Sequence, residues 1–106
     1  MDLTKMKCVP CEGIGRAMSP ADARKMIKNL PGWKIRGKMI AREFKFKDFV
    51  GSVKFINRVM KVAESNGHHP DLHVHWNRVT VEMWTHAVGG LSQNDFVVAA
   101  KIDRVA

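Results

Sequence analysis

All five histidines of this chain lie between residues 68 and 86, in the stretch GHHPDLHVHWNRVTVEMWTH. Imidazole changes its charge near neutral pH and is also a common metal ligand. A small domain does not need such a cluster in order to fold. The cluster therefore indicates chemistry, either proton transfer or metal binding, and the elements around each histidine must supply the geometry.

His68 and His69 are followed directly by Pro70. The proline ring fixes its own φ and restricts the residue before it to extended backbone, which limits how the two imidazoles can point. A rigidly held pair of such groups suits general acid–base catalysis. The alternative is structural, because an imidazolium near the C-terminus of a helix stabilises the helix dipole. The pair by itself does not decide between the two interpretations.

The other three histidines also allow ordinary explanations. His73 and His75 stand two residues apart on the polar side of an alternating strand, close enough to chelate a metal ion. A catalytic metal needs a third ligand at a defined distance, and the neighbouring sequence dictates none, so we expect two solvated side chains. His86 ends a strand just before Ala87-Val88-Gly89-Gly90, where a ligand can reach backbone; the alternative is a histidine satisfied by its neighbours.

Two acidic residues flank the histidines in the sequence. Asp95 is the third residue after Ser92, so an acid there stabilises the start of a helix. Glu64 falls in the last turn of the preceding helix, where a negative charge is unfavourable for the dipole. That local conflict indicates a non-structural reason for Glu64.

Caps, turns and periodicity predict three helices and four strands that position these residues. Ser19-Pro20 begins a helix and Pro31-Gly32 stops it, Asp48 begins a long helix that ends at Asn66-Gly67, and Ser92 caps the last. The expected strands are 33–36, 39–46, 72–76 and 79–86. The order α-β-β-α-β-β-α predicts an α+β fold, a four-stranded antiparallel sheet with helices packed on one face.

The hydrophobic pattern also predicts which faces are buried. Helical spacing indicates one buried stripe on the long helix and a buried face on the last helix. Leu72, Val74 and Trp76 share one side of their strand, which Asn77-Arg78 turns back. The helix residues predicted as buried are Phe49, Val53, Ile56, Met60 and Ala63, then Phe96, Val97, Ala100 and Ile102.

Composition favours one globular domain without a membrane span. The chain has 106 residues, 45% of them hydrophobic, and a formal net charge of +8. The basic residues concentrate in residues 1–61 but are scattered singly, so we interpret them as a solvated surface and expect no direct nucleic-acid binding. The N-terminus lacks the apolar run of a secretory signal. We expect a cytoplasmic location, or also a nuclear one in a eukaryotic cell.

Cys8 and Cys11 form a single C-x-x-C pair. Such a pair is at most half of a structural zinc site, and no second pair follows. We therefore expect no metal here. Residues 1–18 are predicted to be a poorly ordered N-terminal arm, and residues 19–106 a single domain.

The spacing of the site residues resembles the active-site pattern of the pterin-4a-carbinolamine dehydratases. Three residues lie between the acid and His-His-Pro, and five lie between that proline and an aromatic residue. Nine residues then lie between the aromatic residue and the next histidine, and eight between that histidine and an aspartate. The phrases LPGW, FKFKDF and THAVGGLSQNDF are also similar to that family, from about residue 19 to the C-terminus. One departure is Leu72, where the animal forms have a tryptophan. The residues in the pattern are Glu64, His68, His69, Pro70, Trp76, His86 and Asp95.

This resemblance implies dehydration of a 4a-hydroxytetrahydropterin, the spent cofactor of aromatic amino acid hydroxylases, without metal or organic cofactor. It implies that His68, His69 and His86 are the acid–base and hydroxyl-contacting groups. Glu64 and Asp95 would orient them, Trp76 would supply an apolar wall, and Pro70 would fix the loop. It also implies a homodimer or homotetramer. Two alternatives stay open: a non-catalytic protein-binding or coactivator module of the same fold, and a metal-dependent enzyme.

Overall fold

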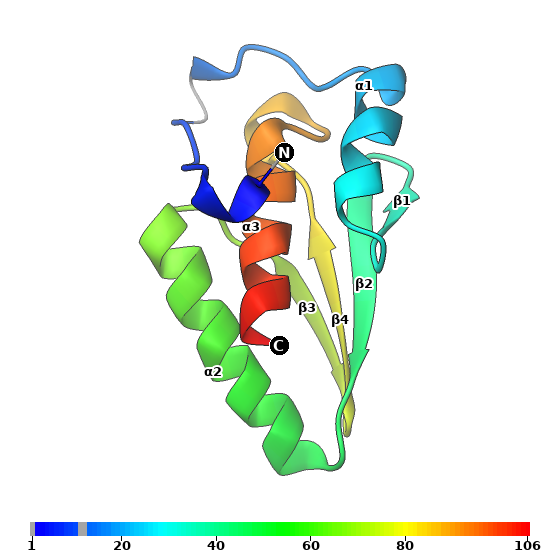
Figure 1. Cartoon of the computed structure of the whole chain (residues 1–106), viewed down its shortest axis with the longest axis vertical. Coiled ribbons are helices and arrows are strands. Elements are labelled where there is room, and N and C mark those ends of the chain that lie inside the picture. The colour runs from blue at the N-terminus through cyan, green and yellow to red at the C-terminus, as the bar shows by residue number, and fades with distance from the viewer. Residues whose placement is uncertain (1, 11–12) are drawn as a thin grey trace.

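The predicted order of helices and strands is present in the computed structural model, which describes residues 2–10 and 13–106 (Figure 1). The chain forms the expected α+β fold with three α-helices and four strands, and short 3-10 turns join or precede them. The elements are η1 (Leu3–Lys5), α1 (Pro20–Met26), η3 (Ile27–Asn29), β1 (Lys34–Arg36), β2 (Met39–Lys45), α2 (Phe49–Asn66), β3 (Asp71–His75), β4 (Arg78–Met83), η4 (His86–Val88) and α3 (Gln93–Val105).

The four strands form one antiparallel sheet in the order β1-β2-β4-β3. The register pairs Ile40 with Met83 and Phe44 with Val79, which places these buried residues on the same face. Their core cluster also contains buried residues of α1, α2 and α3. The helices therefore pack on one face of the sheet, as predicted, and β1 and β3 are its edges.

Both ends of α2 are fixed by local contacts. The Asp48 carboxylate accepts a hydrogen bond from the Gly51 amide at 2.8 Å, which caps the N-terminus. Gly67 ends the helix with φ 62°, a left-handed conformation that suits glycine. His68 therefore leaves the helix at a defined point, as the sequence predicts.

The predicted buried stripe of α2 was correct at Ala63 and in part at Ile56, which is half-buried against the core, and was wrong at the other three positions. Phe49 and Met60 are each 53% exposed and Val53 is 39% exposed. The buried face instead centres on Phe55, whose ring lies 4.7 Å from that of Phe44 and 5.0 Å from that of Phe46. The helix carries apolar residues on two neighbouring sides. The periodicity therefore predicted the helix correctly but did not show which of the two sides faces the core. The residues that are buried are Ser52, Phe55, Val59 and Ala63.

The hairpin of β3 and β4 turns one residue earlier than predicted. The turn is at Trp76-Asn77, where Trp76 has φ 50°, and His75 pairs with Arg78 across the strands. The return strand is also shorter than expected. It ends at Met83, and His86 begins the 3-10 turn η4 instead of ending the strand.

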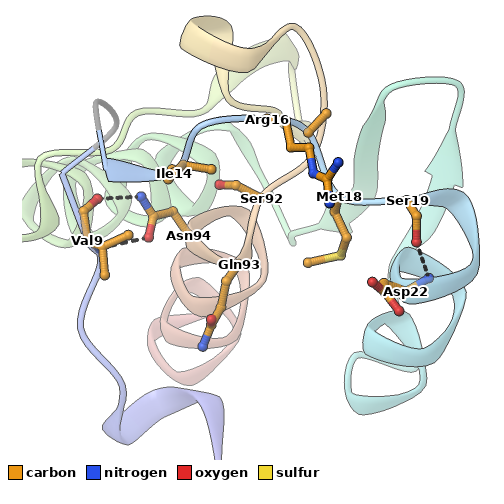
Figure 2. Close-up of a pocket in the computed structure, with 10 residues that line it drawn as sticks. Val9, Ile14, Arg16, Met18, Ser19, Asp22, Ser92, Gln93 and Asn94 are labelled. Atoms are coloured by element: carbon orange, nitrogen blue, oxygen red, sulfur yellow. Dashed lines mark hydrogen bonds between the residues drawn. The ribbon is translucent and has the colours of Figure 1, made fainter.

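The described part of the N-terminal segment is packed, in contrast to the poorly ordered arm that we predicted. Leu3 is only 3% exposed and belongs to the core cluster. The Val9 amide donates to Asn94 Oδ1 at 2.9 Å, and the Asn94 amide donates to the Val9 carbonyl at 2.8 Å, as Figure 2 shows. These contacts lie at the start of α3, far from residue 9 in the sequence. Cys11 of the C-x-x-C pair lies outside the described residues.

Candidate active site

A cleft of about 280 Å³ opens where α2 ends, β3 begins and β4 leads into η4. It brings together the histidine pair, the proline that follows it and the histidine eighteen positions further along. Its lining residues are Gly67, His68, His69, Pro70, Asp71, Trp84, His86 and Ala87.

His68 forms the floor of this region and is held by a buried carboxylate. Its side chain is 7% exposed, and its Nε2 lies 2.6 Å from Oδ1 of Asp95, which is fully buried. The other oxygen of Asp95 accepts hydrogen bonds from the Ser92 amide and the Thr85 hydroxyl, each at 2.9 Å. Both carboxylate oxygens are therefore engaged, which fixes the carboxylate and so fixes the imidazole.

His69 lies at the surface, paired with Glu64. The Nε2 of His69 contacts Oε2 of Glu64, and the two side chains are 60% and 70% exposed. This contact accounts for the acid in the last turn of α2, where the helix dipole disfavours it. Pro70 follows at the start of β3, so His69 is held between a helix end and a rigid residue.

His86 lines the cleft from the start of η4, in contact with an aromatic ring. Its ring is stacked on that of Trp84, with centroids 3.9 Å apart and planes inclined by 27°. Trp84 Nε1 donates to Oδ2 of Asp71 at 3.3 Å. Trp84 was not among the site residues predicted from the sequence; the available signal was a large aromatic two residues before a predicted site histidine.

Trp76 does not line this cleft, contrary to the prediction that it supplies an apolar wall. It is 68% exposed in the turn at the far end of β3. Six positions separate it from Pro70, which at about 3.3 Å per residue is a distance of about 20 Å along an extended strand. The aromatic side chain of the cleft within this chain is therefore Trp84.

His73 and His75 lie outside the cleft, as predicted. The Nε2 of His73 lies 2.8 Å from Oε1 of Glu82 on the neighbouring strand. Among residues 2–10 and 13–106, no three histidine, cysteine or acidic side chains are grouped so that they could hold a metal ion. Metal independence of the protein stays a prediction.

A larger cavity, about 620 Å³, lies between the N-terminal segment and the starts of α1 and α3 (Figure 2). No histidine lines it, and its charged lining residues are the exposed Arg16 and Asp22. Two of its polar lining groups are already engaged within the chain, since the Asp22 amide donates to Ser19 Oγ and the Asn94 side chain pairs with Val9. The chemistry therefore favours the smaller histidine cleft as the active site.

The arrangement in the histidine cleft can move protons in both directions. His69 and His86 both line this cleft and are both exposed, so one imidazole can donate a proton while the other accepts one. His68 and Asp95 lie beneath them as a buried pair. These imidazole and carboxylate groups are suited to general acid–base catalysis.

The comparison with protein families agrees with this geometry. The sequence model described as pterin 4 alpha carbinolamine dehydratase matches residues 16–105. The chain belongs to this family. Its members are hydro-lyases by name, and the match contains every residue of the candidate site.

Individual relatives match over most of this chain. Pterin-4-alpha-carbinolamine dehydratase 2, mitochondrial, of Arabidopsis thaliana is 44% identical over 98% of this chain, which spans 59% of the plant protein. A relative from Thermosynechococcus vestitus, which carries a provisional dehydratase name, is 51% identical over 88% of this chain and 98% of its own length.

Solved structures support the same fold. A transcriptional coactivator/pterin dehydratase from Brucella melitensis superposes with a TM-score of 0.80 at 31% identity, covering 86% of this chain and 99% of that one. A pterin dehydratase-like protein, identified as a RuBisCO assembly factor, matches with a TM-score of 0.62 at 22% identity, which shows the fold alone. Within the described residues, none of the helices is both long and apolar enough to span a membrane.

Proposed function

We propose that this protein dehydrates a 4a-hydroxytetrahydropterin, such as 4a-hydroxytetrahydrobiopterin, to the quinonoid dihydropterin and water by histidine acid–base catalysis. The reaction would return the spent pterin of an aromatic amino acid hydroxylase towards its reusable form. The observation that carries the proposal is that His68, His69 and His86 meet at one cleft in a chain of the dehydratase family.

The reaction needs two proton movements and no change in oxidation state. The bond between C4a and the hydroxyl oxygen breaks as that oxygen takes up a proton, and the ring N–H beside C4a gives up a proton. We assign these transfers to His69 and His86, because both are exposed at the cleft. His68 and Asp95 would orient the loop and the substrate from beneath. Neither transfer calls for a metal ion or an organic cofactor.

The test is turnover of synthetic 4a-hydroxytetrahydropterin by the wild-type protein and by four single alanine variants. We expect His69→Ala and His86→Ala to lower turnover by roughly 10²- to 10⁴-fold, the usual contribution of a general acid or base. His73→Ala and His75→Ala are matched controls outside the cleft and should stay near wild type. Activity should also survive EDTA.

Two results would contradict the proposal. A wild-type protein without turnover would remove the dehydratase function, and equal losses at all four histidines would remove the assignment of roles. Loss of activity on removal of a stoichiometric metal would instead favour the metal-dependent alternative.

We also propose that the protein forms a homodimer or homotetramer. The edge strands β1 and β3 present unpaired backbone groups, which proteins generally cover or pair. In addition, α2 exposes apolar side chains on a side next to its buried side. These are Phe49, Val50, Val53 and Met60, each 39% to 59% exposed.

The same exposed side of α2 favours a protein-binding module as the second candidate function. The structural relative from Brucella melitensis is named as a transcriptional coactivator as well as a pterin dehydratase. A wild-type protein without turnover that loses a protein partner on substitution in α2 would favour this candidate.

The cytoplasmic location stays a prediction, since the plant relative carries a mitochondrial name.

A further inference from the structure

We propose that Trp84 is a positioning residue that sets the orientation of the His86 imidazole. The inference rests on the proposed function, because it concerns one of the two histidines to which we assign proton transfer. It adds a residue that lies outside the active-site pattern of the sequence.

The three site histidines are held in different ways. His68 is held by Asp95 and His69 by Glu64, in both cases through a carboxylate. In the part of the chain that the structure describes, neither ring nitrogen of His86 makes a hydrogen bond. The stack on Trp84 is therefore the contact that can define the plane of the His86 ring.

The Trp84 ring is itself held from two directions. Its Nε1 donates to Asp71 Oδ2 at 3.3 Å, and the ammonium of Lys38 lies 4.8 Å from its ring centroid. Asp71 begins β3 and Lys38 belongs to the turn before β2, the two strands that flank β4 in the sheet. Trp84 follows the end of β4, so its side chain is fixed by both neighbours.

This placement connects the two segments of the chain that line the cleft. Asp71 directly follows His69-Pro70, and His86 stacks on the ring that Asp71 holds. The distance between His69 and the His86 imidazole is thereby set through Trp84. A stacked ring leaves both nitrogens of His86 available to a substrate, whereas a hydrogen-bonding partner would occupy one of them.

The test compares Trp84→Leu, which removes the stack, with Trp84→Phe, which keeps an aromatic face but loses the N–H to Asp71. We expect Trp84→Leu to lower kcat by roughly tenfold or more with little change in KM, since misplacing a reacting group by about 1 Å can cost up to 10²-fold. Trp84→Phe should recover most of that loss.

A spectroscopic measurement reports the stack independently of turnover. The indole ring current should shift the His86 Cε1–H resonance upfield in the wild-type protein. The shift should vanish in Trp84→Leu, persist in part in Trp84→Phe, and stay unchanged in Trp76→Leu, which removes an exposed tryptophan far from the cleft.

The outcomes separate this inference from the proposed function. If the wild-type protein shows no turnover but does show the shifted His86 resonance, the proposed function is contradicted and the stacking of His86 on Trp84 is still supported. Normal kcat in folded Trp84→Leu, a change in KM alone, or an unshifted His86 resonance in the wild type would overturn the positioning role. If Trp84→Leu does not fold, Trp84→Phe and the wild-type resonance still decide.

Discussion

At the residue scale, the site depends on a carboxylate that is both structural and positioned for function. Asp95 forms a capping box with Ser92 at the start of α3, as the sequence predicts. The same carboxylate holds His68 and accepts the hydroxyl of Thr85. A helix cap and a site contact thus share one fully buried side chain.

We expect Asp95→Asn to lower the free energy of unfolding by about 1–3 kcal/mol, because an amide cannot accept from all three partners of the carboxylate. Turnover should fall as well, since His68 loses its fixed partner. Asp22→Asn is the matched control, because Asp22 follows the cap Ser19 by the same three residues but is exposed. Its effect should stay within about 0.5 kcal/mol. Equal losses in urea unfolding of the two variants would contradict this account.

At the scale of elements, α2 carries two apolar sides that differ in burial. One side packs Phe55 against the rings of Phe44 and Phe46 and is completely buried. The other exposes Phe49, Val53 and Met60 to the surroundings. An exposed apolar side of this extent on a surface helix is typical of an interaction surface.

Two phenylalanine truncations on α2 distinguish the two sides. Phe55→Ala should lower the free energy of unfolding by about 3–5 kcal/mol, because it leaves a cavity in the core. Phe49→Ala should change it by less than about 0.5 kcal/mol at concentrations where the protein is monomeric, and should weaken self-association. Urea unfolding at several protein concentrations and sedimentation velocity measure both effects. An oligomer that Phe49→Ala leaves unchanged would remove this side of α2 from the proposed interface.

At the scale of the whole molecule, one carboxylate joins the sheet to the end of α3. Asp103 accepts from Trp33 Nε1 at 3.0 and 3.1 Å and from Arg42 Nη1 at 2.9 Å. Arg42 lies on the same side of β2 as the buried Ile40 and Phe44, and this partner explains its inward position. Burial raises the pKa of Asp103 above its ordinary value of 3.8, and the contacts with Trp33 and Arg42 offset this only in part.

The raised pKa predicts how stability changes with pH. The folded protein holds the Asp103 proton more tightly than the unfolded chain, so the stabilisation from this group is complete below pH 3.8 and is lost as pH rises through the raised value. Asp103→Asn removes that titration. The unfolding free energy of wild type minus that of Asp103→Asn should therefore fall as pH rises from below 3.8 through the raised pKa of Asp103. Urea unfolding of both proteins across this range measures it, and a difference that rises with pH would refute the prediction.

The sequence by itself determined the features that depend on neighbours in the chain. Ser19, Asp48 and Ser92 begin helices, and Gly67 ends one, because caps and turns join residues only a few positions apart. The order of elements followed from these signals and from periodicity. The spacing of the site residues indicated the family, which the comparisons then confirmed.

The tertiary structure decided everything that depends on contacts between distant residues. The rotation of α2 follows from the Phe44, Phe46 and Phe55 rings, and two apolar sides on one helix leave it undetermined in the sequence. The pairing of His68 with Asp95 joins residues 27 positions apart, and that of Val9 with Asn94 joins residues 85 apart. Spacing assigned the aromatic wall to Trp76. In the folded sheet, β3 runs away from the cleft at about 3.3 Å per residue, so Trp76 lies far from it. Trp84, directly after the end of β4, lines the cleft instead.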